Sequence, residues 1–161
     1  MGKESNMYSD FYLIFKRLFD IFVSCVALII TFPITIIVSI AIYIEDGGPI
    51  FYTQERIGKD GYPFKIYKFR SMCVDADKKK TGLKDKNEID GAMFKISNDP
   101  RITRVGEFIR KHSIDELPQL INVLIGNMTI VGPRPPLAEE VREYTTYDKK
   151  RLIVKPGCTG L

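Results

Sequence analysis

Apolar residues are concentrated in one unbroken stretch near the N-terminus of the chain. Residues 18–44 contain a single charged residue, Asp20, whereas charges are frequent from residue 45 onward. As a straight α-helix this stretch would be about 40 Å long, which exceeds the roughly 30 Å hydrocarbon core of a bilayer. The pattern therefore predicts a membrane segment, followed by a polar, densely charged domain.

Pro33 lies near the middle of the apolar stretch. Proline removes a backbone donor and clashes with the preceding turn, so a kink is expected there. Each half is then roughly 18 Å long, enough to enter a bilayer but not to cross it. Lys16 and Arg17 precede the stretch and further basic residues follow it, which suits two cytoplasmic ends. We therefore predict a re-entrant helix-break-helix hairpin, with an ordinary tilted spanning helix as the alternative.

Polar groups within the apolar stretch need partners. Asp20 is costly in lipid, and Arg17 lies three residues earlier on the same helical face, so it is the expected partner of Asp20. Backbone groups freed at a break also need partners, and the hydroxyls of Ser24, Thr31 and Thr35 could supply some of them.

Two short strands are predicted directly after the apolar stretch. Residues 50–55 and 64–70 have strand-like composition, and residues 58–61 supply a Gly-Lys-Asp-Gly turn between them. Lys68 and Arg70 are two positions apart, so they should project from the same face of the second strand. The pattern predicts a β-hairpin whose charges either are solvated or face a site.

Helical spacing follows in the second half of the chain. Apolar residues between 102 and 109 fit one helix face. Ser113-Ile114-Asp115-Glu116 matches the S-x-x-E capping box, which predicts a helix opening there and ending at Gly126. Residues 137–147 suggest a last amphipathic helix, and the chain from Lys155 onward is rich in turn residues.

These elements predict an α+β fold with two parts. Residues 1–47 form an N-terminal segment and a re-entrant membrane helix hairpin broken at Pro33. Residues 48–161 form a small, mostly helical cytosolic domain with a short β-hairpin. The length of 161 residues allows one domain with an appendage.

Composition excludes several classes of function. The net charge of +4 is too mild to indicate nucleic acid. The three cysteines form no CxxC pair, which suggests a reducing compartment without a zinc site. His112 is the only histidine, so a Ser-His-Asp triad is nearly excluded. The glycine-rich loops of the usual nucleotide-binding folds are missing from the sequence.

The adjacent carboxylates Asp115 and Glu116 are the remaining candidates for chemistry. Acidic residues in a first helical turn also complement the helix dipole, so a purely structural role is an open alternative. Arg110 lies upstream, and Arg134 is held between prolines. Carboxylates near arginines and helix N-terminal amides can receive a phosphate and a divalent cation. We expect those neighbours to favour the ionised form of Asp115.

Several motifs occur together in one order along nearly the whole chain. They are Lys16-Arg17-Leu18-Phe19-Asp20, the apolar stretch with Pro33, Lys65-Ile66-Tyr67-Lys68-Phe69-Arg70-Ser71-Met72, Asn98-Asp99-Pro100-Arg101-Ile102-Thr103, Ser113-Ile114-Asp115-Glu116-Leu117-Pro118-Gln119 and Val131-Gly132-Pro133-Arg134-Pro135. This set resembles the bacterial sugar transferase family, the monotopic phosphoglycosyl transferases that begin capsule, exopolysaccharide and O-antigen assembly.

The resemblance implies a reaction, partners and a place in the cell. A UDP-sugar would donate a sugar-1-phosphate to polyprenyl (undecaprenyl) phosphate, with release of UMP, at the cytoplasmic face of the bacterial inner membrane. Asp115 would be the nucleophile that forms a covalent phosphosugar intermediate, and Glu116, together with Asp115, would hold Mg2+. The family's re-entrant helix corresponds to the segment with Arg17, Asp20 and Pro33.

The cations near the two carboxylates fit the same chemistry. A carboxylate that approaches a diphosphate needs its repulsion offset, and Lys68, Arg70, Arg110 and Arg134 are the expected phosphate-binding residues. The implied partners are the UDP-sugar, polyprenyl phosphate and the lipid bilayer, with no nucleic acid. The oligomeric state stays open, a homo-oligomer included.

The family pattern normally continues beyond the Pro-Gly-x-Thr-Gly-Leu motif with which this sequence ends. The sequence is therefore expected to lack a C-terminal segment of the family. Two alternatives follow from the residues: a truncated, noncatalytic membrane-anchored binding or regulatory module, and a single-span protein whose basic domain is recruited to anionic lipid.

Overall fold

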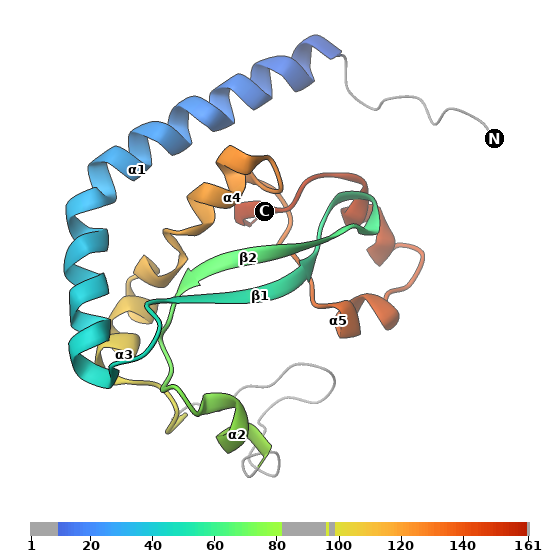
Figure 1. Cartoon of the computed structure of the whole chain (residues 1–161). Coiled ribbons are helices and arrows are strands. Elements are labelled where there is room, and N and C mark those ends of the chain that lie inside the picture. The colour runs from blue at the N-terminus through green and yellow to red at the C-terminus, as the bar shows by residue number, and fades with distance from the viewer. Residues whose placement is uncertain (1–9, 82–95, 97–98, 161) are drawn as a thin grey trace.

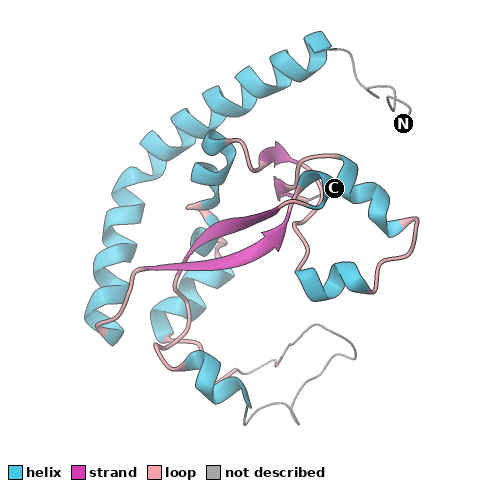
Figure 2. Cartoon of the chain, turned by 45° about the vertical axis from the view of Figure 1, so that its right-hand side comes forward, coloured by secondary structure: helices cyan, strands magenta, loops and turns pink. Residues whose placement is uncertain are grey.

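The computed structural model describes residues 10–81, 96 and 99–160, and it has an α+β architecture. One long helix runs around one side of the molecule, and a β-hairpin and short helices lie on its concave side (Figures 1 and 2). The described elements are α1 (Asp10–Asp46), β1 (Phe51–Ile57), η1 (Lys59–Gly61), β2 (Pro63–Phe69), α2 (Ala76–Thr81), α3 (Arg104–Lys111), η3 (Ile114–Glu116), α4 (Gln119–Ile125), β3 (Thr129–Val131), α5 (Ala138–Arg142), η4 (Asp148–Ile153) and β4 (Gly157–Thr159), where η marks a 3-10 helix.

The predicted β-hairpin is confirmed. Strands β1 and β2 pair in antiparallel register from Phe51 opposite Phe69 to Ile57 opposite Pro63. A buried amide from α4 occupies the free edge of β2: Asn122 accepts a hydrogen bond from the Tyr67 amide at 2.9 Å and donates one to the Lys65 carbonyl at 2.7 Å. The side chain satisfies edge groups that a third strand would otherwise pair.

A second, parallel strand pair joins β3 to β4 near the C-terminal end of the described chain. The sequence predicts only turns from Lys155 onward, so this pairing is a finding of the structure. Gly132 and Gly157 permit it, because a Cβ on Gly157 would lie 2.1 Å from the amide nitrogen of Gly132. A parallel pair of three residues carries too little periodicity to be recognised in sequence.

Two small apolar cores hold these elements together. One combines Val38 and Ile42 of α1 with Phe69 and Ile109, and the other combines Ile66, Val123 and Met128. The C-terminal half of α1 therefore shares a core with the hairpin and α3. Burial of such side chains supplies about 1.5–3 kcal/mol each in transfer free energy, which fixes α1 against the domain.

Helix α1 is continuous through Pro33, so the predicted break of the helix is not seen. The 37-residue helix bends near its middle in the ribbon (Figure 1), as expected where proline removes one backbone bond. Nearby hydroxyls bond back to the preceding turn, with Thr31 donating to the Ala27 carbonyl at 2.7 Å and Thr35 to the Phe32 carbonyl at 2.7 Å. Proline at position 33 leaves only the backbone bond to the Ile29 carbonyl unmade, so the helix bends without ending.

The N-terminal half of α1 is attached to the domain by polar side chains. Arg17 donates to the carbonyls of Val123 and Leu124 at 2.6 and 2.7 Å, and so caps the C-terminus of α4. The predicted Arg17–Asp20 pair is therefore wrong. Asp20 lies 3.4 Å from Lys16 instead and is only 4% exposed. Its carboxylate also accepts hydrogen bonds from β3.

Strand β3 supplies the remaining partners of Asp20. The carboxylate accepts a hydrogen bond from the Thr129 hydroxyl at 2.7 Å and one from the Ile130 amide at 3.1 Å. Lys16 also donates to the Thr129 hydroxyl. These bonds satisfy a carboxylate that would otherwise be buried without compensation.

The C-terminal end of α1 is attached to the same domain. Glu45 accepts hydrogen bonds from the amides of Arg104 and Val105 at 2.7 and 3.0 Å, at the start of α3. Asp46 accepts one from the Val74 amide at 2.9 Å and lies 3.5 Å from Arg70. Both ends of the apolar helix are thus fixed to one small domain.

Candidate active site

The two adjacent carboxylates lie on a single 3-10 turn, η3, between α3 and α4. Ser113 precedes this turn with a positive φ of 56° and makes no side-chain cap. The predicted capping box is therefore wrong, and α4 begins only at Gln119, after Pro118. A residue in the left-handed region ends α3 abruptly, so the chain turns sharply and presents Asp115 and Glu116 outside a regular helix.

Apolar neighbours fix the orientation of this turn. Ile114 and Leu117, on either side of the carboxylates, pack against the core that contains Phe69 and Ile109. The two apolar anchors hold Asp115 half-buried at the surface of the domain. Packing therefore sets the position of the carboxylates.

Lys68 of β2 contacts Glu116 directly. Its Nζ lies 2.6 Å from Oε1 of Glu116, and their side chains are 26% and 42% exposed. Lys68 stands opposite Tyr52 in the hairpin register, on the face that also carries Ile66 of the second core. The predicted meeting of Lys68 with the carboxylates is thus seen in the structure.

The pKa of Asp115 is raised above its ordinary value, although the neighbouring cations act in the expected direction and favour the ionised form. Burial of the carboxyl is the largest cause, and the negative charge of Glu116 adds to it. Lys68 and Arg110 lower the pKa but do not outweigh burial. Sequence spacing shows the cations but not the desolvation, which depends on packing.

The other predicted cations occupy different places. Arg110, at the end of α3, is exposed and close enough for its charge to act on Asp115. Arg134 is 63% exposed and lies 3.9 Å from Glu140. Arg70 is 7% exposed and faces Asp46 at the end of α1, so its guanidinium contributes to helix attachment.

Arg56 of β1 belongs to the same neighbourhood and was not among the predicted site residues. Its pKa is lowered, first by burial and next by the positive charge of Arg134, and Glu116 raises it. Arg56 Nη2 donates a hydrogen bond to Oε1 of Gln54 at 2.7 Å. The sequence pattern that could have identified Arg56 is the alternation of Tyr52, Gln54 and Arg56 along the strand, which places all three side chains on one face.

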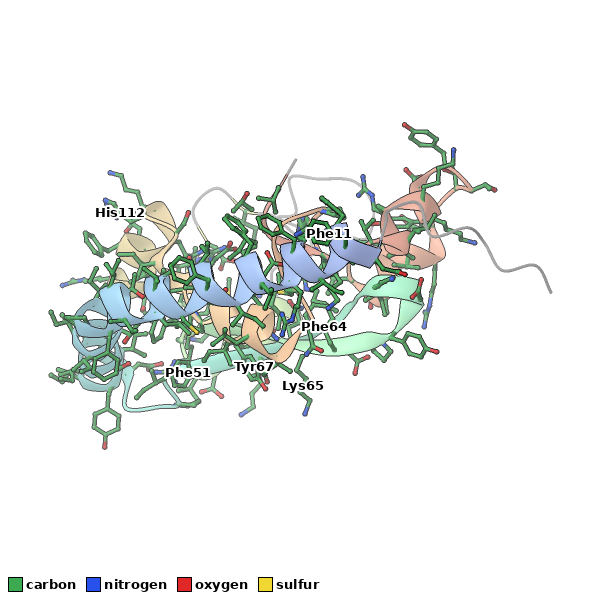
Figure 3. All side chains as sticks on the ribbon, turned by 90° about the horizontal axis from the view of Figure 1, so that it is seen from above. Phe11, Phe51, Phe64, Lys65, Tyr67 and His112 are labelled. Atoms are coloured by element: carbon green, nitrogen blue, oxygen red, sulfur yellow. The ribbon has the colours of Figure 1, made fainter. Side chains whose placement is uncertain are left out.

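The single histidine lies outside this group of charges. His112 follows α3 (Figure 3), is exposed, and has its Nδ1 2.9 Å from the carbonyl of Phe108. Its ring also contacts the Phe108 ring at 4.5 Å between centroids. These contacts place the His112 ring at the surface of the domain.

The carboxylates have the donor chemistry of a magnesium site shared with a ligand. Among residues 10–81, 96 and 99–160, no group of three or more His, Cys, Asp or Glu side chains could hold a metal ion alone. Magnesium typically uses one or two protein carboxylates and completes its shell with water and substrate phosphates. Asp115 and Glu116 fit that mode of binding.

Helix α1 is the one helix in the described part of the chain that is long and apolar enough to cross a membrane. Most of its large apolar side chains are exposed; Phe11 and Ile44, near its two ends, are 80% and 77% exposed. Seen from above, α1 crosses the top of the molecule, with Phe11 near one end (Figure 3).

The site thus combines a half-buried carboxylate with nearby cations, in a small domain to which both ends of an apolar helix are attached. The chain belongs to the bacterial sugar transferase family, whose profile matches residues 11–161. This membership agrees with the resemblance seen in the sequence motifs.

Individual relatives carry related names. The chain is 48% identical over 156 residues to galactosyl transferase CpsE of Streptococcus agalactiae, covering 97% of this chain. It is 46% identical over 150 residues to undecaprenyl-phosphate galactose phosphotransferase of Salmonella typhimurium, covering 91%. It is 41% identical over 152 residues to UDP-glucose:undecaprenyl-phosphate glucose-1-phosphate transferase of Klebsiella pneumoniae, covering 92%.

The chain spans about a third of the length of these relatives, with 34%, 31% and 30% of each covered in turn. The matching third contains the apolar helix, the hairpin and the carboxylate turn. Two of the names refer to galactose and one to glucose, so similarity over this region does not identify one sugar.

Proposed function

We propose that this chain forms the membrane-anchored catalytic region of a phosphoglycosyl transferase. The region would transfer a sugar-1-phosphate from a UDP-sugar to undecaprenyl phosphate and release UMP, at the cytoplasmic face of the inner membrane. The observation that carries the proposal is the pairing of a half-buried Asp115 with the Lys68–Glu116 contact, in a domain fixed to an apolar helix. The names of the Salmonella and Klebsiella relatives support it.

The chemistry assigns a covalent role to Asp115. A carboxylate oxygen of Asp115 attacks the β-phosphorus of the UDP-sugar, and the bond from that phosphorus to the bridging oxygen breaks, so that UMP leaves with the oxygen. A phosphate oxygen of undecaprenyl phosphate then attacks the same phosphorus and the Asp115 carboxylate leaves. Because the reaction has two steps, the water-soluble donor and the lipid acceptor can bind and react one after the other.

The cations near Asp115 and the bound metal ion would offset the negative charge of the reacting phosphates. Lys68 and Arg110 lie near Asp115, and positive groups placed where negative charge gathers lower the barrier without reorganising during the reaction. Asp115 and Glu116 would hold Mg2+, which neutralises phosphate charge when bound. Glu116 would then share its carboxylate between that ion and Lys68.

The decisive experiment measures UMP release by the full chain in lipid nanodiscs. UDP-glucose, UDP-galactose and N-acetylated UDP-sugars are supplied separately with undecaprenyl phosphate and Mg2+. Release with at least one donor, dependent on the lipid acceptor, supports the proposal. A correctly folded chain that releases UMP from none of them would contradict it for this region.

The attachment of both ends of α1 to one domain supports a re-entrant arrangement in the membrane. Arg17 and Asp20 bind α4 and β3, whereas Glu45 binds the start of α3. A helix whose two ends contact one polar domain cannot place them on opposite sides of a bilayer without breaking one set of contacts. We therefore propose that α1 enters the membrane from the cytoplasmic face and returns to it.

Cysteine labelling is expected to find residues near positions 5 and 59 on the same, cytoplasmic side. Single cysteines are introduced at Ser5 and Lys59 after replacement of Cys25, Cys73 and Cys158. An impermeant maleimide should label neither site in intact cells and both after permeabilisation. Labelling of one site alone from outside would contradict the arrangement.

Pro33→Ala is the matched variant for this arrangement. Alanine restores a backbone donor and removes the ring clash, so it should favour a straight helix. We expect a fraction of the Ser5 cysteine to become accessible from outside, while the Lys59 cysteine stays protected.

Chelation is expected to abolish UMP release by this region. A diphosphate that meets Asp115 and Glu116 brings like charges together, and Mg2+ would relieve the repulsion. Glu116→Gln should lower activity and raise the Mg2+ concentration needed for half-maximal rate. Full turnover in excess EDTA would remove the metal from the mechanism.

A further inference from the structure

Arg56 stands out because its guanidinium has no carboxylate at ion-pair distance among the described residues. Its Nη1 donates to the Pro135 carbonyl at 3.2 Å and its Nη2 to the Gln54 side chain at 2.7 Å. The buried Nε has no hydrogen-bond partner in the part of the chain that the structure describes. A guanidinium carries five N–H donors, of which these two bonds use two, so Arg56 has donors left for another group.

Arg134 brings a second guanidinium close to the first. It follows β3 in the segment that also supplies the Pro135 carbonyl to Arg56. The two positive charges repel, since Arg134 lowers the pKa of Arg56. The carboxylate oxygen that faces Arg134 belongs to Glu140, at 3.9 Å, which is beyond hydrogen-bond length.

Glu140 balances part of this charge from within the fold. One of its oxygens accepts a hydrogen bond from the Leu137 amide at 2.9 Å, as a helix cap of α5. The other oxygen is buried without a hydrogen bond within the described residues. The capping bond therefore fixes the orientation of Glu140. Within the described residues its carboxylate forms no bidentate contact with Arg56 or Arg134.

The position of Arg56 links it to the carboxylate turn. Arg56 and Lys68 lie on one face of the hairpin, because Arg56 pairs with Phe64 and Lys68 with Tyr52 in the same antiparallel register. Lys68 contacts Glu116 at 2.6 Å, and the charge of Glu116 also acts on Arg56. The charge of Arg56 therefore acts on the proposed reaction centre, and Arg134 lies close to Arg56.

We propose that Arg56 and Arg134 form a two-arginine subsite that binds a phosphate group next to Asp115 and Glu116. Planar guanidiniums bind phosphate oxygens through paired hydrogen bonds, and a phosphate between the two would remove their mutual repulsion. The inference rests on the proposed function, in which the phosphate belongs to the nucleotide that leaves. The phosphate of the lipid acceptor has the same chemistry, and the test separates the two.

The test measures binding to the full chain in nanodiscs by calorimetry, with UMP, inorganic pyrophosphate and geranyl phosphate as probes. Arg56→Gln should weaken UMP and pyrophosphate binding on the order of 10- to 100-fold, the effect of losing charge-assisted hydrogen bonds. Arg56→Lys should recover only part of the affinity, because a point charge replaces the planar donor group. Arg142→Gln, a change of the same type at an exposed site on α5, should have no effect.

Cooperation between the two arginines is tested by a double-mutant cycle. Arg134→Gln should weaken the same probes, and the double variant should lose less affinity than the sum of the single losses in free energy. Additive losses would show two independent contacts and overturn the paired subsite. A loss confined to geranyl phosphate would assign the arginines to the lipid acceptor and overturn the nucleotide assignment.

Unchanged binding of all probes in Arg56→Gln and Arg56→Lys would overturn the inference even if the parent chain releases UMP. Conversely, Arg56-dependent pyrophosphate binding by a parent chain without UMP release would contradict only the proposed function. Thermal unfolding of each variant is measured alongside, and Arg56→Lys keeps the test valid if Arg56→Gln unfolds.

Discussion

Asp115→Asn is expected to remove turnover by roughly 10⁴-fold or more while the protein stays folded and membrane-bound. An amide cannot form the acyl phosphate, and loss of a nucleophile leaves only the rate that binding and charge stabilisation provide. The measurement is UMP release, together with a mass-spectrometric search for a phosphosugar adduct without the lipid acceptor. The adduct should form on the parent chain and be missing from Asp115→Asn.

Asp115→Asn should raise the stability of the protein, whereas replacement of a purely structural acid should lower it. An acid that only complements a helix start would cost about 0.3–1 kcal/mol of stability on replacement. The raised pKa of Asp115 instead means that folding disfavours its charged form. The parent therefore loses stability as pH rises from the ordinary carboxyl value through the raised pKa, and Asp115→Asn should unfold at a higher temperature at pH 7.

The matched control is Asp60→Asn on η1. Asp60 is exposed and has a φ of 56°, a conformation that asparagine also adopts readily. Activity and unfolding temperature should both match the parent. An Asp115→Asn protein that turns over near the parent rate would overturn the covalent mechanism.

Arg101→Met is expected to cause the largest loss of stability, about 3–5 kcal/mol. Asp99 and Arg101 form an ion pair at 2.6 Å with both side chains 5% exposed. The guanidinium Nε also donates to Asp99 at 2.8 Å. Methionine would leave the buried Asp99 carboxylate without its main partner, and the unfolding temperature should fall by about 10 °C.

The pH dependence of this effect has a definite sign. Hydrogen bonds from Arg101 hold the pKa of Asp99 below its ordinary value of 3.8. The pair therefore stabilises the fold above that value, and this stabilisation is lost as pH falls through the lowered pKa. The difference between parent and Arg101→Met should accordingly shrink on acidification.

Lys78→Met is the control for Arg101→Met. Lys78 and Asp75 form an exposed pair at 3.0 Å, with side chains 86% and 58% exposed, and solvent screens such pairs strongly. Its removal should leave the unfolding temperature unchanged. Equal losses in both variants would show that burial does not distinguish the two pairs.

The local patterns of the chain were sufficient to predict its strongest elements. Alternation and a Gly-Lys-Asp-Gly turn predicted the hairpin of β1 and β2, and helical spacing predicted α3. The apolar stretch predicted α1, because a run of that length with a single charge is typical of a membrane helix. Motif order also led to the family, which the profile match bears out.

Predictions that rested on the local preference of a single residue differ from the structure. Pro33 was expected to break the helix, yet α1 continues through it, since one lost backbone bond is small against the packing of Val38 and Ile42. Ser113 was expected to cap a helix, yet it adopts a left-handed conformation. Apolar packing of Ile114 and Leu117 on either side of the carboxylates decided that turn.

The sequence by itself determined the apolar helix, the hairpin and the identity of the carboxylate pair, because these follow from local periodicity and motif order. Tertiary structure alone decided which charges meet. It joined Lys68 to Glu116, attached Arg70 to the end of α1, and brought Arg56 beside Arg134. It also set the direction of the Asp115 pKa, because desolvation depends on which distant side chains cover a group.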